Sequence, residues 1–176
     1  SDELSASQYV QRNEQRELQQ EVLWQAMKSA VTRLQAEERF RDLQIIEMLF
    51  YAQLRNKEIG KLLNVNEKQV ALVKHRLVKR LAEEVSIDEQ LADDMLITRL
   101  WEQHRPTCPK RSTIGKWLMG TLNESWDQYI AFHVDTLGCR FCQANREDLR
   151  TDATPVTTKT ARQRIMQSSL GFFRSQ

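Results

Sequence analysis

Residues 55–85, RNKEIGKLLNVNEKQVALVKHRLVKRLAEEV, predict two helices that meet at a sharp turn. Leucine, glutamine, glutamate, lysine and arginine dominate the chain as a whole, and this mixture favours helix. The first helix covers about residues 56–63, residues 64–66 break it, and a longer helix begins at Glu67. Asn66 suits the N-cap position of the second helix, because its side-chain oxygen can accept from an unpaired backbone N–H.

Two helices that cross at a steep angle need particular residues at particular places. Gly60 is small enough for a close approach, and Val65 supplies an apolar side chain for burial in the turn. Val70, Leu77 and Leu81 recur at helical spacing, so we expect them to anchor the second helix in a core.

The other face of the second helix is predicted to be exposed, polar and cationic. Its side chains are Lys68, Gln69, Lys74, His75, Arg76, Lys79 and Arg80. Long cations reach phosphates, and polar tips reach base edges in the major groove. Together with Asn66 these residues are the candidate DNA-binding residues. A solvated helix face with no ligand is the alternative interpretation.

Composition and periodicity extend the helical prediction to the whole chain. The 176 residues include only five glycines and three prolines, and no run shows the two-residue period of a strand. We therefore expect an all-α fold in two small domains. The expected order is a linker or solvated helix over 1–17, a four-helix domain over 18–85, an acidic connecting helix over 86–103, a small helical domain over 104–150, and a linker with a basic amphipathic C-terminal helix over 151–176.

Two of the expected helices have specific features. The acidic helix should cover about residues 88–103, with an apolar face made of Leu91, Met95, Leu96, Leu100 and Trp101. Ser112 is the expected N-cap of a short helix that runs through Leu118.

Residues 18–85 resemble region four of bacterial sigma factors, especially the extracytoplasmic-function group. The positions that carry the resemblance are Glu58-Ile59-Gly60, Leu62-Leu63, Val65, Asn66, Val70, Arg76 and Leu81. The resemblance implies a helix-turn-helix that binds the promoter −35 element, with bases read from about Asn66 to Arg76. It also implies binding to core RNA polymerase. Lys74 departs from the family, which has an apolar residue there, and we expect Leu72 or Val73 to compensate.

A second cluster of unusual residues lies further along the chain. Cys108, His133, Cys139 and Cys142 have the spacing C-x24-H-x5-C-x2-C, and His104 is a spare candidate. Zinc prefers four nitrogen or sulfur ligands in a tetrahedron, and these four residues supply that number. Three alternatives stay open: a zinc site, a metal-free core with reduced thiols, or a redox pair of Cys139 and Cys142.

Residues 104–149 resemble the zinc-binding anti-sigma domain. The segment CPKRSTIGKWLMGTLNESWDQYIAFHVDTLGCRFCQAN, from Cys108 on, shares that family's length, helix rhythm and ligand types. Its gap between histidine and cysteine is five residues rather than three. The two extra residues, within 135–138, are either looped out or spoil the site. The resemblance implies zinc as the cofactor and sigma region two or another regulatory protein as a partner.

Bulk properties limit the remaining function classes. A formal charge of +2 is too small to indicate nucleic-acid binding by itself, so local charge segregation carries that prediction. Three cysteines and no signal peptide indicate a reducing cytoplasm, and no apolar run is long enough for a membrane span. We expect no enzyme, because no nucleophile–base pair, phosphate loop or carboxylate pair stands out.

We therefore expect a transcription-initiation module with a fused regulatory domain. The promoter-melting region two of sigma factors has no counterpart in these residues, so we expect the natural protein to be longer. The alternative is an adaptor that uses the zinc-type domain and the basic tail to bind proteins, without reading DNA directly.

Overall fold

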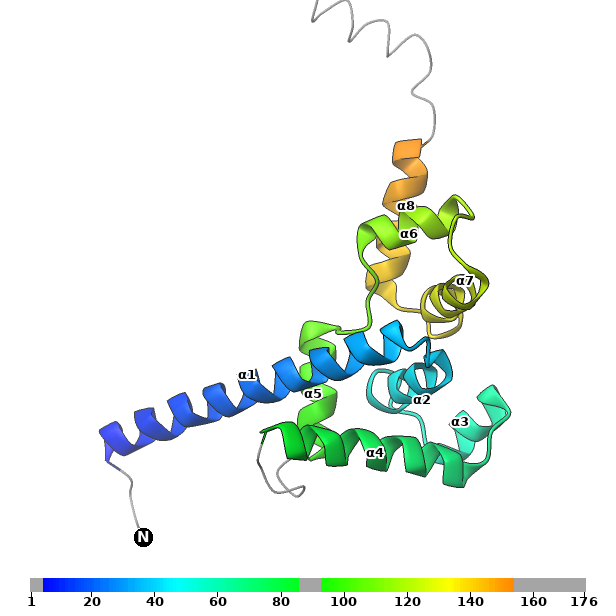
Figure 1. The fold of residues 1–176 in the computed structure, drawn as a ribbon. Coiled ribbons are helices and arrows are strands. Elements are labelled where there is room, and N and C mark those ends of the chain that lie inside the picture. The colour runs from blue at the N-terminus through cyan, green and yellow to red at the C-terminus, as the bar shows by residue number, and fades with distance from the viewer. Residues whose placement is uncertain (1–4, 86–92, 154–176) are drawn as a thin grey trace, which may run out of the picture.

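The computed structural model describes residues 5–85 and 93–153, and within these ranges every regular element is a helix. This confirms the all-α prediction. Figure 1 shows the arrangement. The helices are α1 (Ala6–Ala36), α2 (Phe40–Phe50), α3 (Asn56–Leu63), α4 (Glu67–Val85), α5 (Asp94–His104), α6 (Arg111–Leu118), α7 (Glu124–Ala131), the π-helix η1 (Phe132–Thr136) and α8 (Arg140–Ala153). None of them combines the length and the apolar character needed to cross a bilayer.

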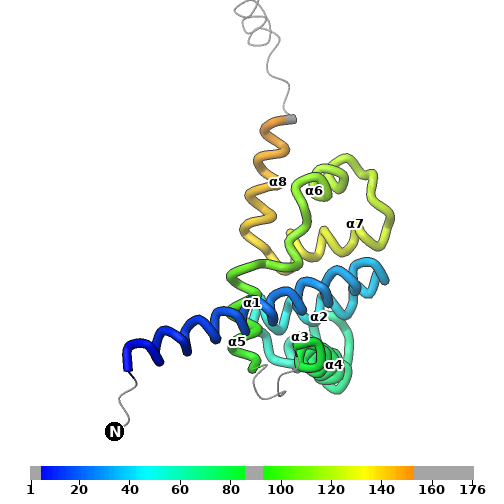
Figure 2. Tube along the Cα trace, turned by 60° about the vertical axis from the view of Figure 1, so that its left-hand side comes forward, coloured from blue at the N-terminus to red at the C-terminus, as the bar shows by residue number. Residues whose placement is uncertain are grey.

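The long helix α1 divides the molecule. Its C-terminal half packs against α2, α4 and α5, and α6, α7 and α8 lie on the other side of it (Figures 1 and 2). Its buried residues begin only at Leu23, so the preceding turns are exposed. Of the two alternatives for residues 1–17, the structure shows the solvated helix from Ala6 onward, with Ser5 as its N-cap.

One hydrophobic core extends through both predicted domains. It includes Leu43 and Phe50 of α2 as well as Ile130 of α7. Aromatic rings join the two parts directly, since Phe40 stacks on Tyr129 with ring centroids 4.6 Å apart. Helix α2 therefore has neighbours on both sides, with α3 and α4 on one and α7 on the other.

The structure places α3, the turn and α4 at the residues that the sequence indicated. The Asn66 side chain accepts from the Gln69 backbone N–H at 2.8 Å, as expected of an N-cap. Val70, Leu77 and Leu81 are buried, but Val65 is only half-buried. The buried residue beside Lys74 is Val73, whereas Leu72 is 44% exposed. Val73 therefore provides the expected compensation.

Two expectations further along the chain are wrong in detail. Met95 is 73% exposed, and the buried face of α5 is formed by Ile97, Leu100 and Trp101. Helix α5 begins at Asp94 because the Asp93 side chain caps it by accepting from the Met95 N–H at 2.7 Å. Helix α6 has Lys110, not Ser112, at its N-cap position. The predicted burial of Leu91 and the tail helix beyond residue 153 lie outside the described residues.

The close approach at Gly60 gives a test of the turn geometry. A Cβ atom at Gly60 would lie 2.7 Å from the backbone carbonyl oxygen of Val65, whereas one at Gly115 meets nothing within 4 Å. We expect Gly60→Ala to lower the free energy of unfolding by about 1–3 kcal/mol, because the backbone must shift. Gly115→Ala is the control and should raise it by about 0.5–1 kcal/mol, through helix propensity. Urea denaturation measures both, and equal effects would contradict the tight turn.

Candidate metal centre

Four side chains from three parts of the fold meet at one point. Cys108 comes from the loop between α5 and α6, His133 from η1, Cys139 from the residue before α8, and Cys142 from the first turn of α8. Their ligand atoms all lie within 4.8 Å of one another. The cluster is the one that sequence spacing selected, and it could hold a metal ion.

The distances suit a small tetrahedral ion. The Sγ atoms of Cys108 and Cys139 are 3.6 Å apart, and the Cys142 Sγ is 3.3 Å from the His133 Nε2. Zn–S bonds of about 2.3 Å in a tetrahedron place two sulfur atoms about 3.8 Å apart. Three thiols and an imidazole are a donor set that zinc favours. The residues present therefore fit a zinc ion.

The five-residue gap after His133 is accommodated by local helix geometry. Residues Phe132–Thr136 form a π-helix, which widens the turn and takes up additional chain at the end of α7. Gly138 then adopts a positive φ of 72°, which a glycine accepts without strain, and the chain enters α8. His104, the spare candidate, is not in the cluster, because its ring stacks on Trp24 at 4.2 Å.

A residue that sequence reasoning missed completes the surroundings of the cluster. Glu47 of α2 has no exposed surface, and its carboxylate lies 2.6 Å from the His133 Nδ1. The same carboxylate accepts a hydrogen bond from the Tyr129 hydroxyl. The signal in the sequence was its position: Glu47 is four residues after Leu43 and three before Phe50, which is the buried face of α2.

This environment controls the proton affinity of the cluster. Burial is the largest single effect and disfavours the imidazolium of His133, but the Glu47 carboxylate and hydrogen bonds with Cys108 and Cys139 together outweigh it and raise the pKa of His133 to about 12. Hydrogen bonds from Cys108 and Cys142 lower the pKa of the Cys139 thiol. The thiolate is the form of cysteine that binds metals.

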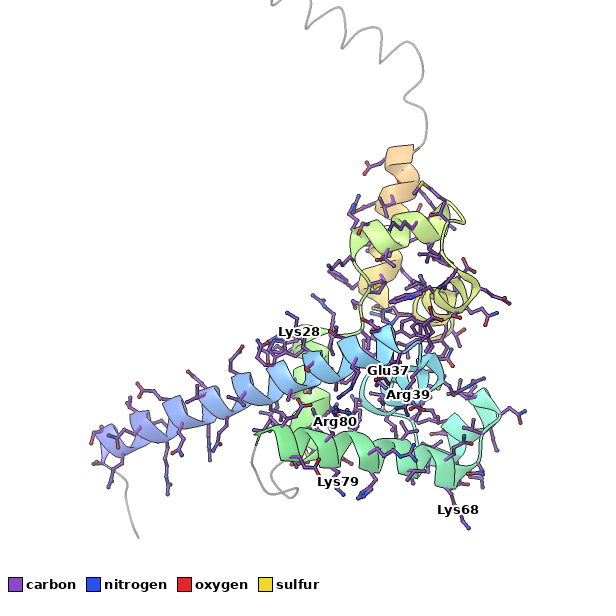
Figure 3. The ribbon with its side chains drawn as sticks, in the orientation of Figure 1. Lys28, Glu37, Arg39, Lys68, Lys79 and Arg80 are labelled. Atoms are coloured by element: carbon purple, nitrogen blue, oxygen red, sulfur yellow. The ribbon has the colours of Figure 1, made fainter. Side chains whose placement is uncertain are left out.

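The candidate DNA-binding residues do not all share one surface. Lys68, Gln69, His75, Arg76 and Lys79 are exposed, and Figure 3 shows Lys68 and Lys79 projecting from α4 on the side away from α1. Asn66, also exposed, caps the helix at the end of this face.

The other two candidates lie on the flanks of α4. Lys74 forms an ion pair with Asp94 of α5, and Arg80 bonds Glu84 at 3.2 Å and lies between α4 and α1 (Figure 3). Two further arginines that the sequence analysis did not select, Arg33 and Arg39, line a cavity of about 210 Å³ together with Arg76 and Arg80.

Comparison with known proteins finds no match among family models, curated proteins or solved structures. Two features of the structure bear on the function of this chain: the Cys/His cluster and the cationic side of α4.

The metal-binding capacity of the cluster can be measured directly. We expect the purified, reduced protein to bind one equivalent of zinc, and the double variant Cys139→Ser, Cys142→Ser to bind none, because two of the four ligands are removed. His104→Gln is the control and should bind as the wild type does. Metal analysis after exhaustive dialysis gives the stoichiometry. Equal zinc content in the wild type and the double variant would exclude the cluster as the binding site.

Proposed function

We propose that this chain is a DNA-binding regulator of transcription initiation, related in mechanism to region four of sigma factors. In this proposal α3 and α4 form a helix-turn-helix, and α4 enters the major groove of a promoter element of the −35 type. The Cys/His cluster holds a structural zinc ion. Core RNA polymerase is the proposed protein partner.

The observation that carries the DNA-binding proposal is the separation of residue types around α4. Val70, Val73 and Leu77 are buried on one side, whereas Lys68 and His75 are exposed on the other. Arg76 is exposed on the flank of α4, beside Arg80 and next to α1. Among the described residues no carboxylate pairs with Lys68, His75 or Arg76, so their donors are available to a ligand. Phosphate binding by unpaired cations is the sequence-independent part of DNA recognition.

Lys68 and Arg76 lie in the N-terminal half of α4 and have no carboxylate partner among the described residues. Lys74, between them, pairs with Asp94. Towards the C-terminal end of α4, Lys79 and Arg80 have carboxylate neighbours in Glu83 and Glu84. A helix-turn-helix reads bases with the first turns of its second helix, so the distribution of unpaired charge agrees with that docking mode. Few phosphates are neutralised by such a face, so we expect binding to be weak and to weaken further as the salt concentration rises.

A structural role for zinc follows from the number of protein ligands. Four donors fill a tetrahedron, which leaves no position for water or substrate. Burial supports the same role, since Cys139, Cys142 and His133 are almost inaccessible to solvent. Zinc therefore acts in this proposal by stabilising the fold of the C-terminal helices.

The second candidate function is a protein-binding adaptor that does not read DNA. It is favoured by the free N-terminal half of α1, where Tyr9, Val10, Leu18 and Val22 are exposed by 42–66%. Exposed apolar side chains on an unpacked stretch of helix are available to a protein partner.

Fluorescence anisotropy with labelled duplex DNA separates the two functions. We expect −35-type duplex to bind more tightly than scrambled duplex at low salt. The variant Lys68→Gln, Arg76→Gln should bind more weakly and lower the salt slope by about 2, because two phosphate-binding cations are removed. Lys28→Gln is the control for the loss of a cation elsewhere, because Lys28 lies on the side of α1 away from α4 (Figure 3). Unchanged affinity in the double variant would favour the adaptor.

A further inference from the structure

The Cys/His cluster is surrounded by residues from both sides of α1. All four ligands follow α5 in the chain, but Glu47 and Tyr51 belong to α2 and its C-terminal end. These two residues are one helical turn apart, so they share a face. Glu47 contacts His133, and Tyr51 is a neighbour of Cys139. Helix α2, which also packs on α3 and α4, thus reaches two of the four ligands.

The contact between Glu47 and His133 fixes the orientation of the ring. The Nδ1 atom lies against the carboxylate, and the Nε2 atom faces the cysteines, 3.3 Å from the Cys142 Sγ. With Nδ1–H donating to Glu47, the Nε2 lone pair is directed at the position that a metal would occupy. A carboxylate in this role sets the tautomer of a histidine ligand and increases its basicity.

The Glu47 carboxylate cannot form hydrogen bonds with solvent in place of its protein partners. It is completely buried, and its two oxygens are used by Tyr129 and His133. If α2 separated from α7 and η1, the carboxylate would lose both hydrogen bonds, and His133 would lose the contact that orients its ring. The orientation of His133 and the packing of α2 therefore depend on the same two contacts.

From this geometry we infer that Glu47 is a positioning residue of the metal centre, and that metal binding is coupled to the packing of α2 against α7 and η1. The inference rests on the proposed zinc site. Coupling between two events is reciprocal: if docked α2 strengthens metal binding, bound metal strengthens the docking of α2 to the same extent. The centre consequently joins the part of the chain that carries α4 to the C-terminal helices, and loss of metal loosens that junction.

The first test measures the zinc dissociation constant by competition with a chromophoric chelator. Glu47→Gln keeps the shape of the side chain but removes its charge, and we expect the dissociation constant to rise about 10–100-fold while the stoichiometry remains one zinc per chain. Asp42→Asn is the matched control on the same helix. Its carboxylate pairs with Arg39 on the surface, so the dissociation constant should not change. A value for Glu47→Gln equal to that of the wild type would overturn the inference.

The second test needs no change at Glu47. Hydrogen–deuterium exchange of the wild-type α2 amides should become faster when zinc is removed by a chelator and slow again when zinc is restored. In Cys142→Ser, the same additions should leave α2 unchanged. If zinc binds but the exchange rate of the wild-type α2 amides does not change, the coupling is overturned. A wild type that binds no zinc would overturn the proposed site together with the inference.

Discussion

The buried carboxylate of Glu47 is the constraint on which the rest of the structure depends. It accepts from the Tyr129 hydroxyl and lies 2.6 Å from the His133 ring, and all three groups are shielded from water. A buried carboxylate is tolerable only when its hydrogen bonds are complete, so α2, α7 and η1 must hold one relative arrangement. The stacking of Phe40 on Tyr129 adds apolar contact to the same junction.

The helices were largely predictable because their signals are local. Asn66 and Asn123 both cap helices as their residue type suggests, with side-chain oxygens accepting at 2.8 and 2.9 Å. Helical spacing identified Val70, Leu77 and Leu81 as buried. The predicted burial of Met95 is wrong because a different face of α5 packs inward. Contacts with α1 and α2, which lie far away in the sequence, determine which face that is. The domain boundaries remain predictions, and one core crosses them.

The metal ligands were also predictable, since cysteine and histidine are rare and their spacing is conspicuous. The surroundings of the ligands were not. Glu47 lies 86 residues before His133, and only tertiary packing brings them together. Lys74 shows the same limit, because its pairing with Asp94 depends on where α5 docks. The gap between His133 and Cys139 is longer than in the family that this segment resembles. The π-helix accommodates the extra residues, and the four ligand atoms stay close together.

X-ray absorption spectroscopy at the zinc edge, on zinc-loaded protein, tests the central claim most directly. A centre closed by Cys108, His133, Cys139 and Cys142 predicts three sulfur atoms at about 2.3 Å and one nitrogen at about 2.0–2.1 Å. A first shell with fewer than three sulfurs, or with a water oxygen among the ligands, would contradict a closed structural centre at this junction.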